Sequence, residues 1–283
     1  MRAQSTVGFL LAAALLLGFP PSLAAASDVE LTGDFVQGGL VRGKVAPGTE
    51  VRFLGRALRV STGGVFVIGF GRDFATTATL KLRYSDGREE LRDLAIERRR
   101  YRIQRIDGLP AKMVTPSAKA LTRIRREAAA IRAVRATDSD RTWFLEGFTW
   151  PAIGPISGVF GSQRVLNGEA RRPHYGVDVA APTGTIVRAP AAGRVALAEP
   201  ELYFTGGTVM LDHGHGLTSV YSHLASVAVT VGRTLARGDP LGTVGATGRA
   251  TGPHLDWRLN WFDQRLDPAL LVGPMPTPPA TKN

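Results

Sequence analysis

The first third of the chain alternates apolar and polar residues in short runs that are separated by glycines. The runs "EVRFL", "VFVIGF" and "LKLRY" keep the two-residue period that is typical of strands with one buried face. The letters "SDGR" at residues 85–88 carry the Asp-Gly signal of a hairpin turn. Residues 27–108 are therefore predicted to form a small β-sandwich-like accessory domain, in which no group of histidines or carboxylates indicates a site.

After this domain the spacing of the apolar residues changes from the two-residue period of strands to the period of a helix. Leu121, Ile124, Ala128 and Ile131 recur at helical spacing, and Ser117 is a candidate N-cap. The arginines of this segment are predicted to fall largely off the apolar stripe: Arg123, Arg125, Arg126, Arg132 and Arg135. Residues 109–141 are thus predicted to be a basic helical linker. We favour a linker helix that packs on a domain with one face and exposes the other to solvent. A helix lying on a membrane surface is the alternative.

Strand alternation returns in the last part of the chain, for example in "DHGHGLTSVYSHL" and "HLDWRLNW". Residues 142–273 are predicted to form an antiparallel β domain, and the proline-rich residues 274–283 a disordered tail. The expected fold class is therefore mainly β, with a small sandwich-like domain, a basic helical linker and a C-terminal antiparallel domain.

Residues 1–26 are predicted to be an export signal rather than part of the fold. Arg2 precedes an apolar run over residues 7–19, and small residues at 24–26 form an Ala-x-Ala cleavage site. No other long apolar run follows, so no integral membrane span is expected after cleavage. The chain has no cysteine, which excludes both a disulfide framework and a lipid-anchored lipoprotein.

The net charge of +11 is unevenly placed along the chain. Residues 92–135 hold 13 lysines and arginines against 4 aspartates and glutamates. Such a segment favours a polyanionic partner, although a solvated basic face is the alternative. Because export argues against nucleic acid, an anionic cell wall or membrane surface is the expected polyanion.

All histidines lie in the C-terminal domain: His174, His213, His215, His223 and His254. On an extended strand, His174 and Asp178 share one face, and Gly176 leaves room between them. His254 and Asp256 share a face in the same way, and His223 ends another apolar run. Imidazole and carboxylate groups are good zinc ligands, and catalytic zinc takes three protein ligands. For the first pair alone, a His-Asp hydrogen bond at a strand end is the alternative.

The His-x-His spacing in "DHGHG" is interpreted differently. Glycines flank both histidines, which is typical of a turn between strands. We expect His213 to hydrogen-bond within this loop and His215 to face solvent.

The motifs "HYGVD", "YSHL" and "GPHLDW" together resemble the lysostaphin- and LytM-type zinc endopeptidases of bacterial cell walls, over about residues 148–272. The resemblance implies an antiparallel β fold with an open groove for a peptide stem. It also implies that His174 and Asp178 bind zinc and that His223 and His254 are catalytic. The third ligand position falls on Asp256, where the family has a histidine. A carboxylate can still bind zinc, but a second aspartate should make the zinc-bound water less acidic and the enzyme slower.

The expected function is therefore a secreted or periplasmic zinc metallo-endopeptidase that hydrolyses peptide cross-links of peptidoglycan. The stem peptides would be its partner, and the loop arginines before the first motif suit their carboxylates: Arg164, Arg171 and Arg172. Two alternatives are a non-enzymatic activator of a cell-wall amidase and a wall-binding module. A further hypothesis is that the N-terminal domain covers the groove.

Overall fold

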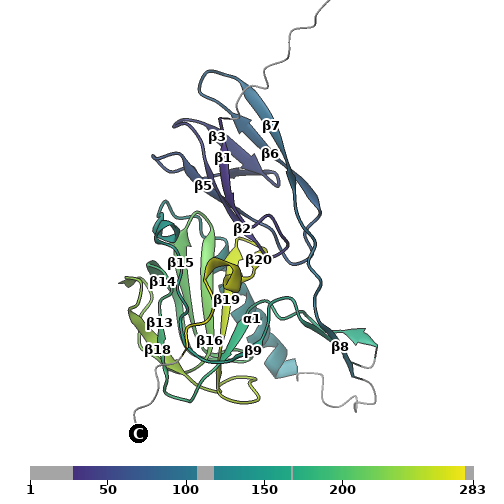
Figure 1. The fold of residues 1–283 in the computed structure, drawn as a ribbon. Coiled ribbons are helices and arrows are strands. Elements are labelled where there is room, and N and C mark those ends of the chain that lie inside the picture. The colour runs from purple at the N-terminus through teal and green to yellow at the C-terminus, as the bar shows by residue number, and fades with distance from the viewer. Residues whose placement is uncertain (1–27, 107–117, 167, 278–283) are drawn as a thin grey trace, which may run out of the picture.

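The computed structural model describes residues 28–106, 118–166 and 168–277 (Figure 1). The predicted signal, the candidate N-cap Ser117 and the last six residues of the predicted tail lie outside the described residues. The described part is mainly β, with a single α-helix and two short 3-10 helices, which confirms the expected fold class. In these residues no helix is both long and apolar enough to cross a membrane.

Two antiparallel sheets form the N-terminal sandwich. One has the order β1-β2-β5 and the other the order β4-β3-β6-β7. Their bounds are β1 Glu30–Gly33, β2 Leu40–Lys44, β3 Glu50–Phe53, β4 Arg56–Leu58, β5 Val65–Gly69, β6 Thr77–Arg83 and β7 Glu89–Ala95. Phe66, Ile68 and Leu80 are completely buried between the sheets. The predicted Asp-Gly hairpin joins β6 and β7, where the Gly87 amide donates to the Tyr84 carbonyl.

A large antiparallel sheet organises the C-terminal part, in the order β17-β14-β15-β16-β19-β12-β9, with β13, β18 and β20 attached to it. Its bounds are β9 Ile156–Gly158, β12 Val177–Ala180, β13 Ile186–Arg188, β14 Gly193–Leu202, β15 Gly206–Gly214, β16 Leu217–Val227, β17 Thr234–Leu235, β18 Pro240–Val244, β19 His254–Trp261 and β20 Gln264–Leu266. The 3-10 helices are η2 Trp143–Glu146 and η3 Pro268–Leu271. A separate small sheet joins β8 (Ile103–Ile106), β10 (Gln163–Leu166) and β11 (Glu169–Ala170).

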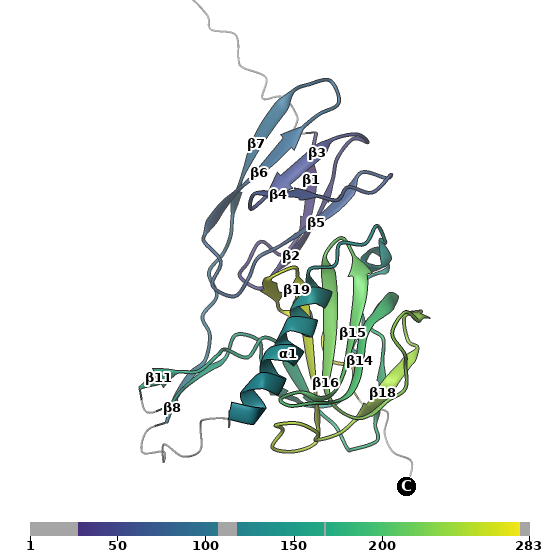
Figure 2. The same cartoon turned by 180° about the vertical axis from the view of Figure 1, so that it is seen from behind.

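The two faces of the large sheet differ in what covers them. One face builds an apolar core around Trp257 and Tyr221. The helix α1 (Ala118–Arg135) covers part of the other face, where Ile131 and Val134 pack against residues of β14, β15 and β16 (Figure 2). The helix is therefore a packed linker, as the sequence favours.

The packed face of α1 is rotated from the predicted stripe. Leu121 is 37% exposed although it lies on that stripe, whereas Arg135 is only 9% exposed. Ile131, Val134 and Arg135 lie three and four residues apart, so they share one side of the helix. The expectation that Arg135 points away from the core is thus wrong.

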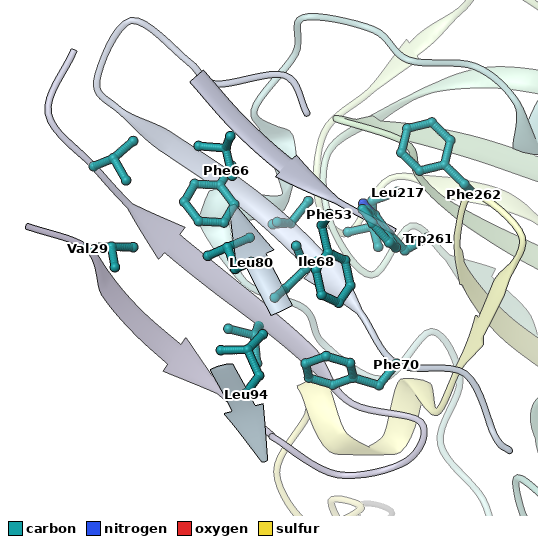
Figure 3. Close-up of a cluster of buried hydrophobic side chains, with 14 of the residues drawn as sticks. Val29, Phe53, Phe66, Ile68, Phe70, Leu80, Leu94, Leu217, Trp261 and Phe262 are labelled. Atoms are coloured by element: carbon teal, nitrogen blue, oxygen red, sulfur yellow. The ribbon is translucent and has the colours of Figure 1, made fainter. Parts of the chain in front are cut away.

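The sandwich and the large sheet share a continuous apolar core. Phe53 and Trp261 have ring centroids 6.0 Å apart, and Phe70 and Phe262 belong to the same buried cluster (Figure 3). Because Trp261 ends β19 and His254 begins it, this contact lies roughly 23 Å along the strand from His254. The sandwich therefore packs at the opposite end of β19 and does not cover His254.

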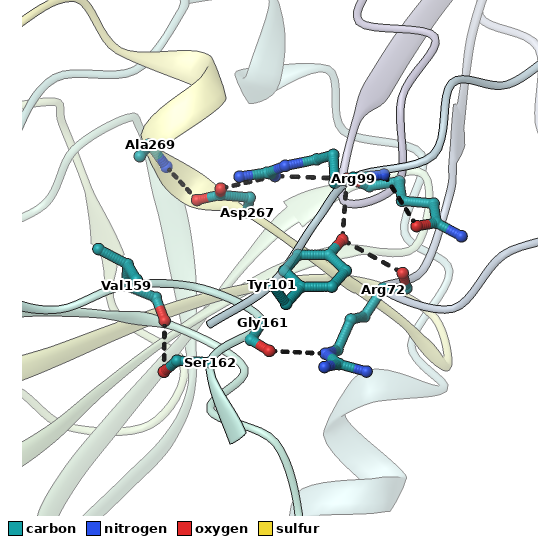
Figure 4. A network of polar contacts seen from close by, with 9 residues as sticks. Arg72, Arg99, Tyr101, Val159, Gly161, Ser162, Asp267 and Ala269 are labelled. Carbon is teal, nitrogen blue, oxygen red and sulfur yellow. Dashed lines mark hydrogen bonds and ion pairs between the residues drawn. The ribbon is translucent and has the colours of Figure 1, made fainter. Parts of the chain in front are cut away.

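Polar contacts tie the same two units together (Figure 4). Arg99 and Asp267 form an ion pair at 2.8 Å. Arg72 donates from Nε to the Gly161 carbonyl at 2.8 Å, and within the N-terminal part the Tyr101 hydroxyl donates to the carbonyl of Arg72. These contacts fix the N-terminal sandwich against the C-terminal part.

Candidate active site

Two carboxylates lie opposite each other on neighbouring strands. The antiparallel register of β12 and β19 places Asp178 directly across from Asp256. Ser222 of β16 is the partner of Asp256 on its other side. Like charges that face each other across a strand pair destabilise a sheet. A cation beside these two carboxylates would remove that repulsion.

His174 completes a set of three ligand atoms. Its Nε2 lies 3.1 Å from Asp178 Oδ1, yet both atoms are buried without a hydrogen-bond partner. His174, Asp178 and Asp256 each offer one ligand atom, and these atoms lie within 4.8 Å of one another. An imidazole and two carboxylates are a donor set that suits zinc, so the residues present fit a bound zinc ion.

Gly176 packs closely against β19. A side chain at this position would meet Asp256 Oδ1 and Arg258 Cγ at 2.6 Å. The glycine therefore makes room for these two side chains of β19. Because Asp256 belongs to the same set of ligand atoms as His174 and Asp178, the space that Gly176 leaves lies beside that set.

His223 and His254 lie beside this set with their rings stacked obliquely, 4.7 Å between centroids. His223 Nδ1 donates to the Thr247 carbonyl and His254 Nδ1 to the Gly252 carbonyl, each at 2.8 Å. A carbonyl only accepts, so in each neutral ring Nδ1 carries the proton and Nε2 is left as an acceptor. His254 Nε2 is 4.0 Å from Asp178 Oδ1.

The backbone and the environment of His223 are both unusual. Its φ of 66° lies in the left-handed region, which non-glycine residues adopt rarely and often at functional sites. Burial lowers the pKa of His223, and the hydrogen bond to Thr247 opposes this shift. The ring is therefore kept neutral at neutral pH and can accept a proton at Nε2.

Arg258 is the residue that the sequence analysis missed. Its Nε lies 2.9 Å from each carboxylate oxygen of Asp256, and its Nη2 also donates to Oδ2. Burial alone would raise the pKa of Asp256, but the charge and hydrogen bonds of Arg258 outweigh it and lower the pKa. The sequence did contain a signal for this contact, because residues 256 and 258 share one face of an alternating strand.

The two remaining histidines lie outside this site. His213 is fully buried; its Nδ1 donates to the Ala192 carbonyl and its Nε2 accepts from Ser219, both at 2.7 Å. His215 is only 3% exposed and packs on the Phe144 ring, so the expectation that it faces solvent is wrong. His213 ends β15 and His215 lies in the following turn, with a φ of 50°.

Two of the three loop arginines before the first motif have side chains that the structure describes. Arg171 pairs with Glu169 at 3.2 Å, and Arg172 is exposed. The side chain of Arg164 lies outside the described part of the structure. Only Arg258, from β19, holds a side chain of the candidate metal set among the described residues.

The sequence and the fold of the chain match known proteins. The model of Peptidase family M23 matches residues 172–268. A solved structure from Pseudomonas aeruginosa, described as a peptidase M23, is 30% identical; the match covers 84% of this chain and 95% of that chain, with a TM-score of 0.64. The chain belongs to peptidase family M23. The resemblance that rests on the three motifs is thereby confirmed at the level of the family.

Curated relatives of this M23 protein have different functions. The DD-carboxypeptidase/endopeptidase Mpg of Neisseria meningitidis is 37% identical over 111 residues, which are 39% of this chain and 25% of Mpg. The murein hydrolase activator EnvC of Escherichia coli is 36% identical over 124 residues, which are 44% of this chain and 28% of EnvC. The M23 chain thus spans about a quarter of the length of these two relatives.

Proposed function

We propose that this M23 protein is a zinc metallo-endopeptidase that hydrolyses peptide cross-links of bacterial peptidoglycan. One observation carries the proposal: Asp178 and Asp256 face each other beside a His174 Nε2 that has no hydrogen-bond partner, and two histidines with acceptor Nε2 atoms lie next to them. Such a combination of a cation site and neighbouring bases is what metal-assisted amide hydrolysis requires.

In this proposal His174, Asp178 and Asp256 hold the zinc ion. When bound there, zinc supplies a Lewis acid that polarises a carbonyl and lowers the pKa of a bound water. His254 is the first proton acceptor, because its Nε2 lies 4.0 Å from an oxygen of the ligand set. The water oxygen forms a bond to the amide carbon while His254 Nε2 takes the water proton. The protonated ring then donates this proton to the leaving amine nitrogen as the carbon–nitrogen bond breaks.

His223 would act on the tetrahedral species that forms when the water oxygen bonds to the amide carbon. Its ring lies 4.7 Å from that of His254, and its Nδ1 is held by the Thr247 carbonyl. Its Nε2 can accept the second proton of the attacking water, and the Nε2–H formed in this way would donate to the negatively charged oxygen on the amide carbon. This step is the electrostatic part of the mechanism, and His223 is its donor.

Peptidoglycan stem peptides are the proposed partner, and the periplasm or the exterior of the cell is the proposed location. The support is the similarity to Mpg, together with the export signal expected at residues 1–26.

The test is to incubate the metal-replete protein with purified peptidoglycan, with and without a chelator, and to record muropeptide masses. Conversion of cross-linked dimers to monomers that the chelator abolishes is the expected result. No conversion by zinc-loaded protein would overturn the proposal.

Activation of a cell-wall amidase is the second candidate, because EnvC is among the relatives. An activator needs neither a metal set nor neighbouring histidine bases. Metal analysis of the purified protein separates the two functions. An amidase that is stimulated equally by the chelated protein and by the zinc-loaded protein would favour the activator.

A further inference from the structure

Two guanidinium groups near the site lack a carboxylate partner. Arg135, at the end of α1, is 9% exposed, and its Nε is buried without a hydrogen bond. Arg265, on β20, donates from Nη1 to the neutral amide oxygen of Asn260. Within the described residues neither arginine forms an ion pair. Burying a cation without a counter-charge is costly, so such groups normally have an anion close by.

These arginines lie on the side of the sheet that carries the candidate metal set. Asp256, Arg258 and Asn260 alternate along one face of β19, and Arg265 is bound to Asn260. Val220, across from Arg258, belongs to the apolar patch on which Ile131 of α1 packs. The last turn of α1 therefore brings Arg135 to the same face as the metal set.

The cationic groups repel one another. Burial, followed by the charges of Arg135 and Arg258, lowers the pKa of Arg265, and Tyr175 and Asp263 oppose this shift. Burial is also the largest cause that lowers the pKa of Arg135, and Arg132, Arg172 and Arg258 add to it against the opposing effect of Asp263. Asp263 is exposed and makes no ion pair among the described residues. An anion bound between Arg135 and Arg265 would relieve both the repulsion and the cost of burial.

We propose that Arg135 and Arg265 form a subsite for a free carboxylate of the peptide substrate. An arginine fork binds a planar carboxylate with two parallel hydrogen bonds, which is why arginine is favoured for this task. From Asp256 to Asn260 the strand rises roughly 13 Å, so the carboxylate lies about four extended residues from the bond that is cut. Arg265 is only half-buried whereas Arg135 is 9% exposed, so a ligand would reach the subsite from the side of Arg265.

This subsite rests on the proposed function for the identity of its peptide, but its binding can be measured without cleavage. The experiment titrates the zinc-loaded full chain with a stem tetrapeptide that carries free carboxylates and with the same peptide fully amidated. We expect the acid to bind about tenfold more tightly than the amide, as one charge-assisted contact predicts. Arg265→Gln and Arg135→Gln should abolish this preference, and Arg265→Lys should keep part of it.

Arg126→Gln is the matched control, because Arg126 is an exposed arginine on α1 away from the packed face. It should bind both peptides as the wild-type protein does, and thermal unfolding should verify that the glutamine variants fold. Equal affinity for acid and amide, or no binding of either, would overturn the subsite. Displacement of the acid by inorganic phosphate at a similar concentration would also overturn it, because the site would then bind any anion.

Cleavage of peptidoglycan distinguishes a failure of the subsite from a failure of the proposed function. Chelator-sensitive cleavage of acid and amidated stems at equal rates would support the peptidase and contradict the subsite. A binding preference for the acid that depends on Arg135 and Arg265 would support the subsite. If peptidoglycan with acid stems and peptidoglycan with amidated stems are both left uncleaved, the same result would contradict the peptidase.

Discussion

Arg258 holds both carboxylate oxygens of Asp256 from two residues further along the same strand. This contact changes the expected effect of an aspartate at the third ligand position. Two aspartate ligands alone would cancel the charge of zinc, whereas the guanidinium restores the single positive charge that a histidine ligand would leave. Because Arg258 and Asp256 are so close, the arginine compensates for the additional carboxylate. The slower enzyme expected from Asp256 alone is therefore not what the pair implies.

Removal of Arg258 should destabilise the metal-free protein far more than the zinc-bound protein. In Arg258→Gln, the buried Asp256 would face Asp178 without a cation, and loss of one partner of a buried ion pair costs about 3 to 5 kcal/mol. Bound zinc would supply the missing positive charge. We expect the rise in melting temperature on zinc addition to be larger for Arg258→Gln than for the wild-type protein, as measured by calorimetry. An equal rise in both would contradict the role given to Arg258.

Asp256 and Arg258 should behave as a coupled pair in a double-mutant cycle. Asp256→His alone would supply the histidine that the resemblance implies at this position but leave a buried guanidinium without a carboxylate beside the proposed metal site. Asp256→His combined with Arg258→Gln removes that conflict. We expect the double variant to bind zinc more tightly than Asp256→His, with a coupling of about 1 to 3 kcal/mol. Chelator competition measures both affinities, and strictly additive effects would show that the two residues act independently.

Replacement of either histidine base should lower turnover without loss of metal. His223 and His254 lie beside the ligand set and bind backbone carbonyls through Nδ1. His254→Ala and His223→Ala should each lower kcat by roughly 10²- to 10⁴-fold, the usual effect of losing a general base or a transition-state donor. Metal analysis is the control, because zinc content should stay unchanged. A loss of zinc in either variant would assign that histidine to the metal set instead.

The sequence predicted the parts of this molecule that depend on local patterns. Alternation located the strands that carry Asp178 and Asp256, because a two-residue period assigns each side chain to a face. It did not predict that these two carboxylates lie directly opposite each other, since strand register depends on pairing between distant segments. His215 was placed in solvent because flanking glycines indicate a turn, whereas burial against Phe144 is a tertiary contact. Arg135 differs, because it lies four residues after Ile131 and helical spacing alone places it on the side of Ile131.

The free energy of unfolding should fall as the pH is lowered, because of His213. This histidine lies away from the metal set. Burial lowers the pKa of His213 from 6.5 to about 4. Above pH 6.5 both the folded and the unfolded states are neutral at this residue. Between pH 6.5 and 4 only the unfolded state takes up the proton, so the free energy of unfolding falls as the pH falls, by about 3 kcal/mol in total.

The variant His213→Gln checks this dependence. Glutamine does not titrate, so denaturant unfolding between pH 7 and pH 4 should show a shallower loss of stability than in the wild-type protein. The variant should also be less stable at pH 7, because it disturbs the hydrogen bonds to Ala192 and Ser219. A slope equal to that of the wild type would assign the acid sensitivity to other groups.

The sandwich and the large sheet should unfold together, because their apolar core is continuous at Trp261. Trp261→Ala should cost about 3 to 5 kcal/mol, the usual cost of removing a buried aromatic side chain. Leu91→Ala is the control, since Leu91 is 68% exposed on β7 and its loss should change stability little. Because the core is shared, a chain that starts near Thr142 should be less stable than the full chain. It should also cleave no faster than the full chain, because the sandwich does not cover His254. Two separate unfolding transitions in the wild-type protein would contradict the shared core, and faster cleavage by the shortened chain would restore an inhibitory role for the sandwich.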